Sequence, residues 1–262
     1  MKRTKIQIEP SDYPHALSAL LTDAAVYDSS CSPEARVIYI EKENGYYLKS
    51  AAEGTLRREA EMTRYFHGKG LSGEVLYYGS EGGRDYLLTS RVRGEDCCDK
   101  QYLDDPRRLS ALLGERLRAL HETEMADCPE RDRMRGYLAT VTENYEKGQY
   151  DLSFLAQGIS HFTADEAYRY VMEHKGAFKN EVLLHGDYCL PNIMLDDWRF
   201  SGFIDLGAGG IGDRHVDLFW GAWTLCFNLG TDAYRDRFFD AYGRDLVDGE
   251  MIRLVSVCEV FG

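Results

Sequence analysis

The sequence lacks the features that mark several large classes of protein. Its first residues, MKRTKIQIEP, contain no apolar run of the kind that a signal peptide needs. Its longest charge-free apolar stretch, Leu218 to Thr231, is shorter than the roughly 20 residues that span a bilayer. Its seven cysteines include no CxxC pair, and the Cys and His spacings fit no zinc site. These absences predict a reduced, cytoplasmic protein that does not enter a membrane.

Signatures of other chemistries are also missing. No GxSxG element for acyl transfer is present, and neither are a glycine-rich GxGxxG loop or the HRD and APE elements of protein kinases. Basic residues are scarce, with 31 against 44 acidic residues and a net charge of −13. This balance argues against a nucleic-acid partner or an anionic membrane surface and is compatible with a cationic ligand, although solubility alone also explains it.

The elements expected from hydrophobic patterning alternate between sheet and helix. A chain of 262 residues can bury a substantial core as one large domain or as two lobes. Helices are predicted over residues 11–22, 56–70, 107–123, 163–174 and 218–231, the fourth opening with Thr163 and Glu166 at near capping-box spacing. Strands are predicted over residues 35–41, 46–50, 73–78 and 85–90.

The stretch with the most candidate functional residues is LLHGDYCLPNIMLDDWRFSGFIDLG, residues 183–207. The apolar run before His185 and the run Phe203-Ile204 flank a polar loop and predict a unit like a β-hairpin. Asn192 and Asp205 suit a nucleotide-bound Mg²⁺, which prefers one or two carboxylates together with phosphate oxygens. Asp187 is then available to act on a substrate hydroxyl. Each residue alone is better explained by turns and caps, but the order H-G-D-x4-N-x12-D indicates phosphoryl transfer.

A lysine in the first half of the chain fits the same chemistry. Lys49 ends a predicted strand, and an inward-facing ammonium group needs a partner because a lone buried charge is costly. Glu59 and Glu61 in the following helix compete for this role, and Glu59 is the better match. A strand lysine paired with a helix glutamate holds the α- and β-phosphates in kinases.

The motifs HGDYCLPNIM, RFSGFIDLG and GDRHVDL together resemble the aminoglycoside phosphotransferases, especially the 3'-phosphotransferase branch. The resemblance implies an α+β, two-lobed, protein-kinase-like fold. Residues 1–92 would form a nucleotide-binding N-lobe of antiparallel sheet plus helix. Residues 93–262 would form a mainly helical C-lobe that carries catalytic β-hairpins and binds the acceptor.

The resemblance also implies roles for individual residues around the nucleotide. Ser32 would lie near the β-phosphate in a small polar loop, and Tyr47 would stack on adenine two residues before Lys49. Backbone groups at Ser90 and Val92 would meet the adenine edge at the inter-lobe hinge, which leaves ATP and GTP undistinguished. The implied cofactors are therefore Mg²⁺ and ATP or GTP.

The acceptor site is expected in the least readable regions. The resemblance makes Asp151, Phe227, Glu259, Phe261 and Gly262 the candidates for holding a cationic aminoglycoside. Two departures stand out: Ala208 replaces the arginine that usually follows the Asp-x-Gly of the family, and Phe227 with Asn228 stands where a carboxylate is expected. Asp217 is expected to act structurally, by tying the catalytic loop to the following helix.

The function that these features predict is Mg²⁺- and nucleotide-dependent phosphorylation of an aminoglycoside hydroxyl at the 3'-position by a monomer or weak dimer, which would confer resistance. The first alternative is the same chemistry on another small hydroxyl compound, such as a different antibiotic or a metabolite. The second is a non-catalytic nucleotide-binding protein, whose signature would be the loss of Lys49, Asp187, Asn192 or Asp205. All four residues are present.

Overall fold

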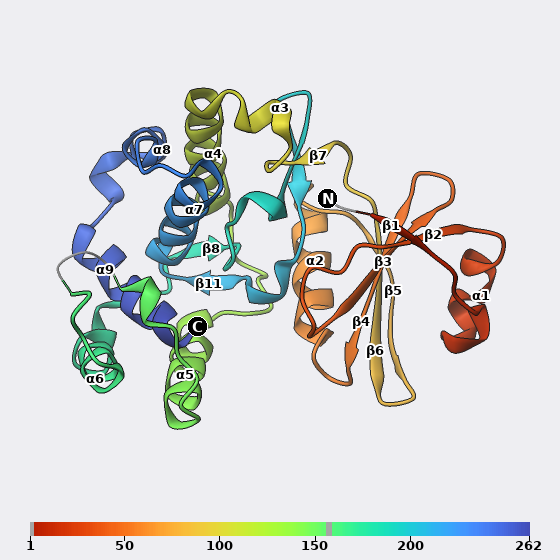
Figure 1. Ribbon diagram of the computed structural model, residues 1–262, viewed down its shortest axis with the longest axis horizontal. Helices are drawn as coiled ribbons and strands as arrows, with labels where there is room; N and C mark the ends of the chain where they lie inside the picture. The colour runs from red at the N-terminus through yellow and green to blue at the C-terminus, as the bar shows by residue number, and fades with distance from the viewer. Residues whose placement is uncertain (1–2, 156–158) are drawn as a thin grey trace. The chain divides into compact units, whose positions relative to one another are not determined.

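The computed structural model describes residues 3–155 and 159–262, and these residues form an α+β structure (Figure 1). Two compact units divide the chain. Unit 1 comprises residues 1–99 and 191–207, and unit 2 comprises residues 100–190 and 208–262. The functional boundary expected after residue 92 stays a prediction.

An antiparallel sheet with the strand order β1-β2-β3-β4-β6-β5 forms most of unit 1. Its strands are β1 (Thr4–Ile6), β2 (Ala25–Asp28), β3 (Arg36–Glu41), β4 (Tyr46–Ala52), β5 (Val75–Glu81) and β6 (Arg84–Ser90). Helices α1 (His15–Leu21) and α2 (Arg57–Gly68) lie on opposite sides of this sheet (Figure 1). The long strands and both helices confirm the sequence predictions, whereas β1 and β2 were not predicted.

Side-chain alternation along β3 and β4 separates the two faces of this sheet. Ile38, Ile40 and Leu48 pack with the buried leucines of α1. Ala51 on β4 packs with α2. Lys49 therefore projects from the α2 face, because it is two residues from Ala51 on the same strand.

Unit 1 also receives a second, three-stranded sheet with the order β10-β9-β7. It contains β7 (Glu95–Asp96), β9 (Ile193–Asp196) and β10 (Arg199–Phe203). The hairpin predicted between the apolar run before His185 and the run Phe203-Ile204 is wrong. The first run forms β8 (Val182–Leu184), which pairs with β11 (Gly210–Gly212), whereas β10 pairs with β9. Both runs are apolar and short, so composition does not identify their partners.

Unit 2 is mainly helical, and several of its helices share an apolar core. Its helices are α3 (Lys100–Leu103), α4 (Pro106–His121), α5 (Arg133–Glu146), α6 (Ala164–His174), α7 (Arg214–Leu229), α8 (Arg235–Tyr242) and α9 (Gly249–Cys258). The expected capping box on α6 is present: Glu166 N donates to Thr163 Oγ1 and Thr163 N donates to Glu166 Oε2. The buried helix expected near residues 218–231 is α7. Over the part of the chain that the structure describes, no helix is both long and apolar enough to cross a bilayer.

Candidate active site

Unit 1 brings Lys49 between two carboxylates. Lys49 Nζ lies 2.7 Å from Glu59 Oε2 and 2.9 Å from Asp205 Oδ1. Glu59 projects from α2, the helix that covers the Lys49 face of the sheet, and Asp205 follows β10. The competing glutamate, Glu61, pairs with Arg57 on the surface of α2 instead. The structure therefore confirms the predicted lysine–glutamate pair and adds Asp205 to it.

Burial and charge act in opposite directions on this cluster. Burial by itself would lower the pKa of Lys49, but the carboxylates of Glu59 and Asp205 outweigh it, and the pKa is raised. Lys49 is therefore a fixed cation throughout the physiological pH range. A fixed ammonium group on a sheet face is suited to offset phosphate charge.

The two predicted metal ligands also lie in unit 1. Ile204 N donates to Asn192 O over 3.0 Å, which links the segments before and after the β9–β10 pair. Asn192 is buried, whereas the Asp205 side chain is 51% exposed. Asp205 has a φ of 58°, a left-handed conformation that is uncommon outside glycine and recurs at functional sites. An amide and a carboxylate oxygen are donors that Mg²⁺ accepts, so this pair fits the metal in its chemistry.

The loop that carries Asp187 lies in unit 2 and is held from α7. The Asp217 carboxylate accepts hydrogen bonds from His185 N and Gly186 N, each over 2.8 Å. His185 is fully buried, and its Nδ1 accepts from Asp187 N over 3.3 Å. Gly186 has a φ of 84°, and a Cβ on it would lie 2.0 Å from Ala208 O, so only glycine fits there. These contacts confirm that Asp217 ties the loop to its helix, and they show that His185 supports the loop from within.

Asp217 also belongs to a buried hydrogen-bond network that was not predicted from the sequence. His121 Nε2 lies 3.2 Å from Asp217 Oδ2, and His121 Nδ1 lies 2.8 Å from the Tyr242 hydroxyl. Burial lowers the pKa of His121, which keeps the imidazole neutral, and burial raises the pKa of Tyr242 to about 12. A neutral His121 then donates to Asp217 and accepts from Tyr242. The partners lie 96 and 121 residues away, so no local pattern indicates them.

The residues expected to contact the adenine of the nucleotide lie in unit 1. Tyr47 shares the sheet face of Lys49, and its hydroxyl accepts a hydrogen bond from Arg3 Nη2 over 2.7 Å. The Arg3 guanidinium also lies 3.8 Å from the centre of the Tyr39 ring. Ser90 N donates to Glu74 O, so this backbone donor is already used in unit 1. Val92 is buried, and the adenine contacts of Tyr47, Ser90 and Val92 stay predictions.

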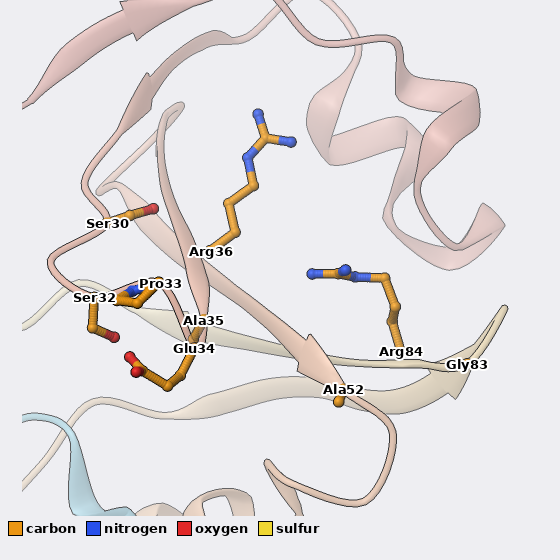
Figure 2. A pocket seen from close by; sticks show the side chains of 9 residues that line it. All are labelled: Ser30, Ser32, Pro33, Glu34, Ala35, Arg36, Ala52, Gly83 and Arg84. Carbon is orange, nitrogen blue, oxygen red and sulfur yellow. The ribbon is translucent and has the colours of Figure 1, made fainter.

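Ser32 lies in an exposed bend between β2 and β3. It borders a hollow of about 520 Å³ that Arg36 of β3 and Arg84 of β6 also line (Figure 2). Arg36 pairs with Ser50 in the sheet register, so it belongs to the face opposite to Lys49. The contact expected between Ser32 and a β-phosphate stays a prediction.

The five candidate acceptor residues lie in unit 2 and differ in exposure. The Asp151 carboxylate caps the short helix η2 (Leu152–Phe154) by accepting from Ser153 N. Glu259 and Phe261 are buried, and Glu259 Oε1 accepts a 2.6 Å hydrogen bond from the Tyr137 hydroxyl. Burial raises the pKa of Glu259 to about 7. Gly262 is exposed, and Phe227 is 70% exposed.

Comparison with known proteins places this geometry in a family. The profile of a phosphotransferase enzyme family matches residues 33–252. The chain is 52% identical over 262 residues to a probable aminoglycoside 3'-phosphotransferase of Lactococcus lactis subsp. lactis (strain IL1403), covering 100% of this chain and 99% of that protein. It is 31% identical over 199 residues to an aminoglycoside 3'-phosphotransferase of Niallia circulans, covering 76% of each.

Solved structures show the same fold. Aminoglycoside phosphotransferase APH(3'')-Id from Streptomyces rimosus superposes with a TM-score of 0.79 at 22% identity, over 97% of this chain and 99% of that one. An aminoglycoside-3'-phosphotransferase of type VIII gives 0.77 at 20% identity, over 99% and 94%. The expected two-lobed, kinase-like α+β fold is thereby confirmed. Because the profile and the whole-length relative agree with the motifs, the chain belongs to the phosphotransferase enzyme family, as an aminoglycoside-phosphotransferase-like enzyme that acts on an alcohol group.

Proposed function

We propose that this enzyme transfers the terminal phosphoryl group of ATP or GTP to the 3'-hydroxyl of an aminoglycoside and so confers resistance to it. The observation that carries the proposal is the cluster of Lys49, Glu59 and Asp205 in unit 1, which reproduces the cation and the metal-type carboxylate of a kinase site. The name of the Lactococcus lactis relative supports the acceptor and the position. A structure of the Streptomyces rimosus enzyme in complex with ADP and streptomycin supports a nucleotide donor.

The roles of the side chains follow from their chemistry. Asp187 accepts a hydrogen bond from the acceptor hydroxyl and orients it. The hydroxyl oxygen forms a bond to the terminal phosphorus, the bond from that phosphorus to the bridging oxygen breaks, and the hydroxyl proton passes to Asp187 late in the step. The nucleoside diphosphate leaves.

The charge of the nucleotide is balanced by other groups. Lys49 neutralises part of the charge on the α- and β-phosphates, and Glu59 fixes its position. Asn192 and Asp205 are the residues that would hold Mg²⁺, which neutralises phosphate charge when it is bound. Asp217 keeps the Asp187 loop in place through the backbone of His185 and Gly186.

The substitution Asp187→Asn tests this function. It keeps the shape of the side chain but removes the proton acceptor, so kcat should fall by roughly 10²–10⁴-fold while the KM for the nucleotide stays within about twofold. The assay is consumption of ATP and of GTP with kanamycin A and neomycin B, with acceptor-independent hydrolysis subtracted. Retention of full activity in Asp187→Asn would overturn the mechanism, and no stimulation of the wild-type enzyme by either compound would overturn the acceptor.

A second candidate is the same reaction on another small hydroxyl compound. The exposed Phe227 favours it, because an apolar ring stands where the resemblance leads one to expect a carboxylate. Structures of the same fold include a spectinomycin phosphotransferase and a macrolide 2'-phosphotransferase. Adding spectinomycin and a macrolide to the same assay separates the candidates, since the preferred acceptor is the one with the highest kcat/KM.

A further inference from the structure

Unit 2 carries a cluster of aromatic rings on one side of α7. Trp223 and Phe227 stack with ring centroids 5.0 Å apart and planes inclined by 12°. Trp220 lies edge-on to Trp223 at 5.3 Å. Phe154 of η2 contacts both tryptophans, at 5.8 and 5.9 Å. Trp220, Trp223 and Phe154 are half-buried, so they fix the position of the outermost ring, Phe227.

The exposure of Phe227 is unusual for so large an apolar side chain. It is 70% exposed, although its neighbour Trp223 packs against the core of unit 2. In the part of the chain that the structure describes, Tyr150 and Leu152 are also exposed large hydrophobic residues, and both belong to the segment around η2 that leads to Phe154. A rigid pair of stacked rings with one face open to solvent is a surface on which another ring can stack.

The stacked pair adjoins the loop that bears Asp187. Leu190 N donates to Thr224 Oγ1 over 3.2 Å, and Thr224 directly follows Trp223 on α7. Asn228, directly after Phe227, donates to the same hydroxyl oxygen. Trp220 of the same cluster also lies against the Glu259 carboxylate. The ring cluster and Asp187 therefore share one neighbourhood within unit 2.

Two of the carboxylates considered for the acceptor site already accept hydrogen bonds. Glu259 is 5% exposed and is bonded to Tyr137. The Asp151 carboxylate accepts from Ser153 N over 2.8 Å. The rings offer this side of Asp187 a contact surface that does not depend on these carboxylates.

We propose that Trp223 and Phe227 form an acceptor subsite that takes one ring of the acceptor through its C–H face, as a carbohydrate ring stacks on an aromatic side chain. The proposal rests on the proposed function, because the subsite is defined by its closeness to Asp187. The acceptor hydroxyl reaches Asp187 while a neighbouring ring of the same molecule lies on Phe227. Phe227 is then a specificity-determining residue, and Trp223 sets its orientation.

The first test is steady-state kinetics of Phe227→Ala with kanamycin A as acceptor. Loss of one stacking partner should raise the KM for kanamycin A roughly three- to tenfold. The KM for ATP and the acceptor-independent hydrolysis of ATP should not change. Phe227→Trp should restore the KM, because it offers a larger ring face. Leu76→Ala, which removes another exposed apolar side chain, in unit 1, should behave as wild type.

Ionic strength distinguishes stacking from charge. The ratio of the KM of Phe227→Ala to that of wild type should be the same at 50 and 500 mM NaCl, since stacking is not screened by salt. A KM within twofold of wild type for Phe227→Ala, or a KM for Phe227→Trp as high as that of Phe227→Ala, would overturn the proposal.

The second test needs no turnover and therefore separates this proposal from the proposed function. The chain has three tryptophans, so Trp198→Phe leaves Trp220 and Trp223 as the only indole fluorophores. Titration of this variant with kanamycin A should change its emission saturably, and the added substitution Phe227→Ala should weaken the binding by the same factor as in the kinetics. If kanamycin A changes the emission but is not phosphorylated, the result contradicts the proposed function and supports the subsite. An emission unchanged by kanamycin A would overturn the subsite.

Discussion

At the scale of single residues, the site of unit 1 depends on how Lys49 shares its charge. Its ammonium group has two carboxylate partners at 2.7 and 2.9 Å, one buried and one half-exposed. A bound metal would draw on Asp205, and Glu59 would then remain as the partner of Lys49. We infer that Glu59 is the residue that keeps Lys49 in place when the nucleotide is bound.

The substitution Glu59→Gln tests this division of roles. It removes a charged hydrogen bond, so the KM for ATP should rise roughly tenfold, the equivalent of one such bond. Glu61→Gln is the matched control on the same helix, because Glu61 pairs with Arg57 at an exposed position and such pairs contribute little. Equal KM values for the two variants, measured by steady-state ATP titration, would contradict the assignment.

Residues of the site differ in how far their sequence context identifies them. Asp187, Asn192 and Asp205 stand at a spacing that few other chemistries use. Lys49 could be identified because a lysine that faces inward from a strand needs a carboxylate nearby. His121 and Tyr242 were not identified, because their role depends on α4, α7 and α8 meeting in space. Burial of Glu259 was likewise not evident, since a glutamate near aromatic residues is usually exposed.

At the scale of elements, long periodic segments were predicted well and short strands were not. The helix α4 carries leucines on one face along 16 residues, which leaves little ambiguity. The strands β8 and β11 have three residues each, too few for a period-two pattern to identify a partner. Contacts distant in sequence surround them, since Asp217 of α7 holds the loop after β8.

The capping box of α6 gives a test of local sequence coding. Thr163→Ala removes the side-chain acceptor of Glu166 N and should lower the free energy of unfolding by about 1 kcal/mol. Thr140→Ala on α5 is the control, because this exposed threonine lies inside a helix, where alanine has the higher helix propensity. Chemical denaturation followed by circular dichroism measures both. A loss at Thr140 equal to that at Thr163 would show that capping is not the cause.

At the scale of the whole molecule, the two units are interleaved along the chain. The backbone passes from one unit to the other after residues 99, 190 and 207. The segment 191–207 brings three things to unit 1: β9 pairs with β7, Phe203 lies edge-on to Phe66 at 6.2 Å, and Asp205 reaches Lys49. Unit 1 is therefore incomplete without a segment that is distant in sequence.

Fragments test this dependence. Residues 1–99 alone should melt at a lower temperature than residues 1–99 joined by a flexible linker to residues 191–207, because the added segment covers Phe66 and pairs with β7. The measurement is thermal unfolding by circular dichroism. A third fragment, with Phe203→Ala in the joined segment, should lose most of the gain. Identical melting temperatures for the first two fragments would show that residues 1–99 are complete by themselves.

The same interleaving has a consequence for synthesis on the ribosome. The last residues of unit 1 are made 108 residues after Asp99 (207 − 99), a delay of roughly 5 to 20 s at 5–20 residues per second. During that interval the emerging N-terminal sheet exposes Phe66 and the edge of β7, which makes it a candidate for chaperone binding and for aggregation. A slow stretch of codons after residue 207 would therefore favour correct folding, whereas one after residue 99 would prolong the vulnerable state.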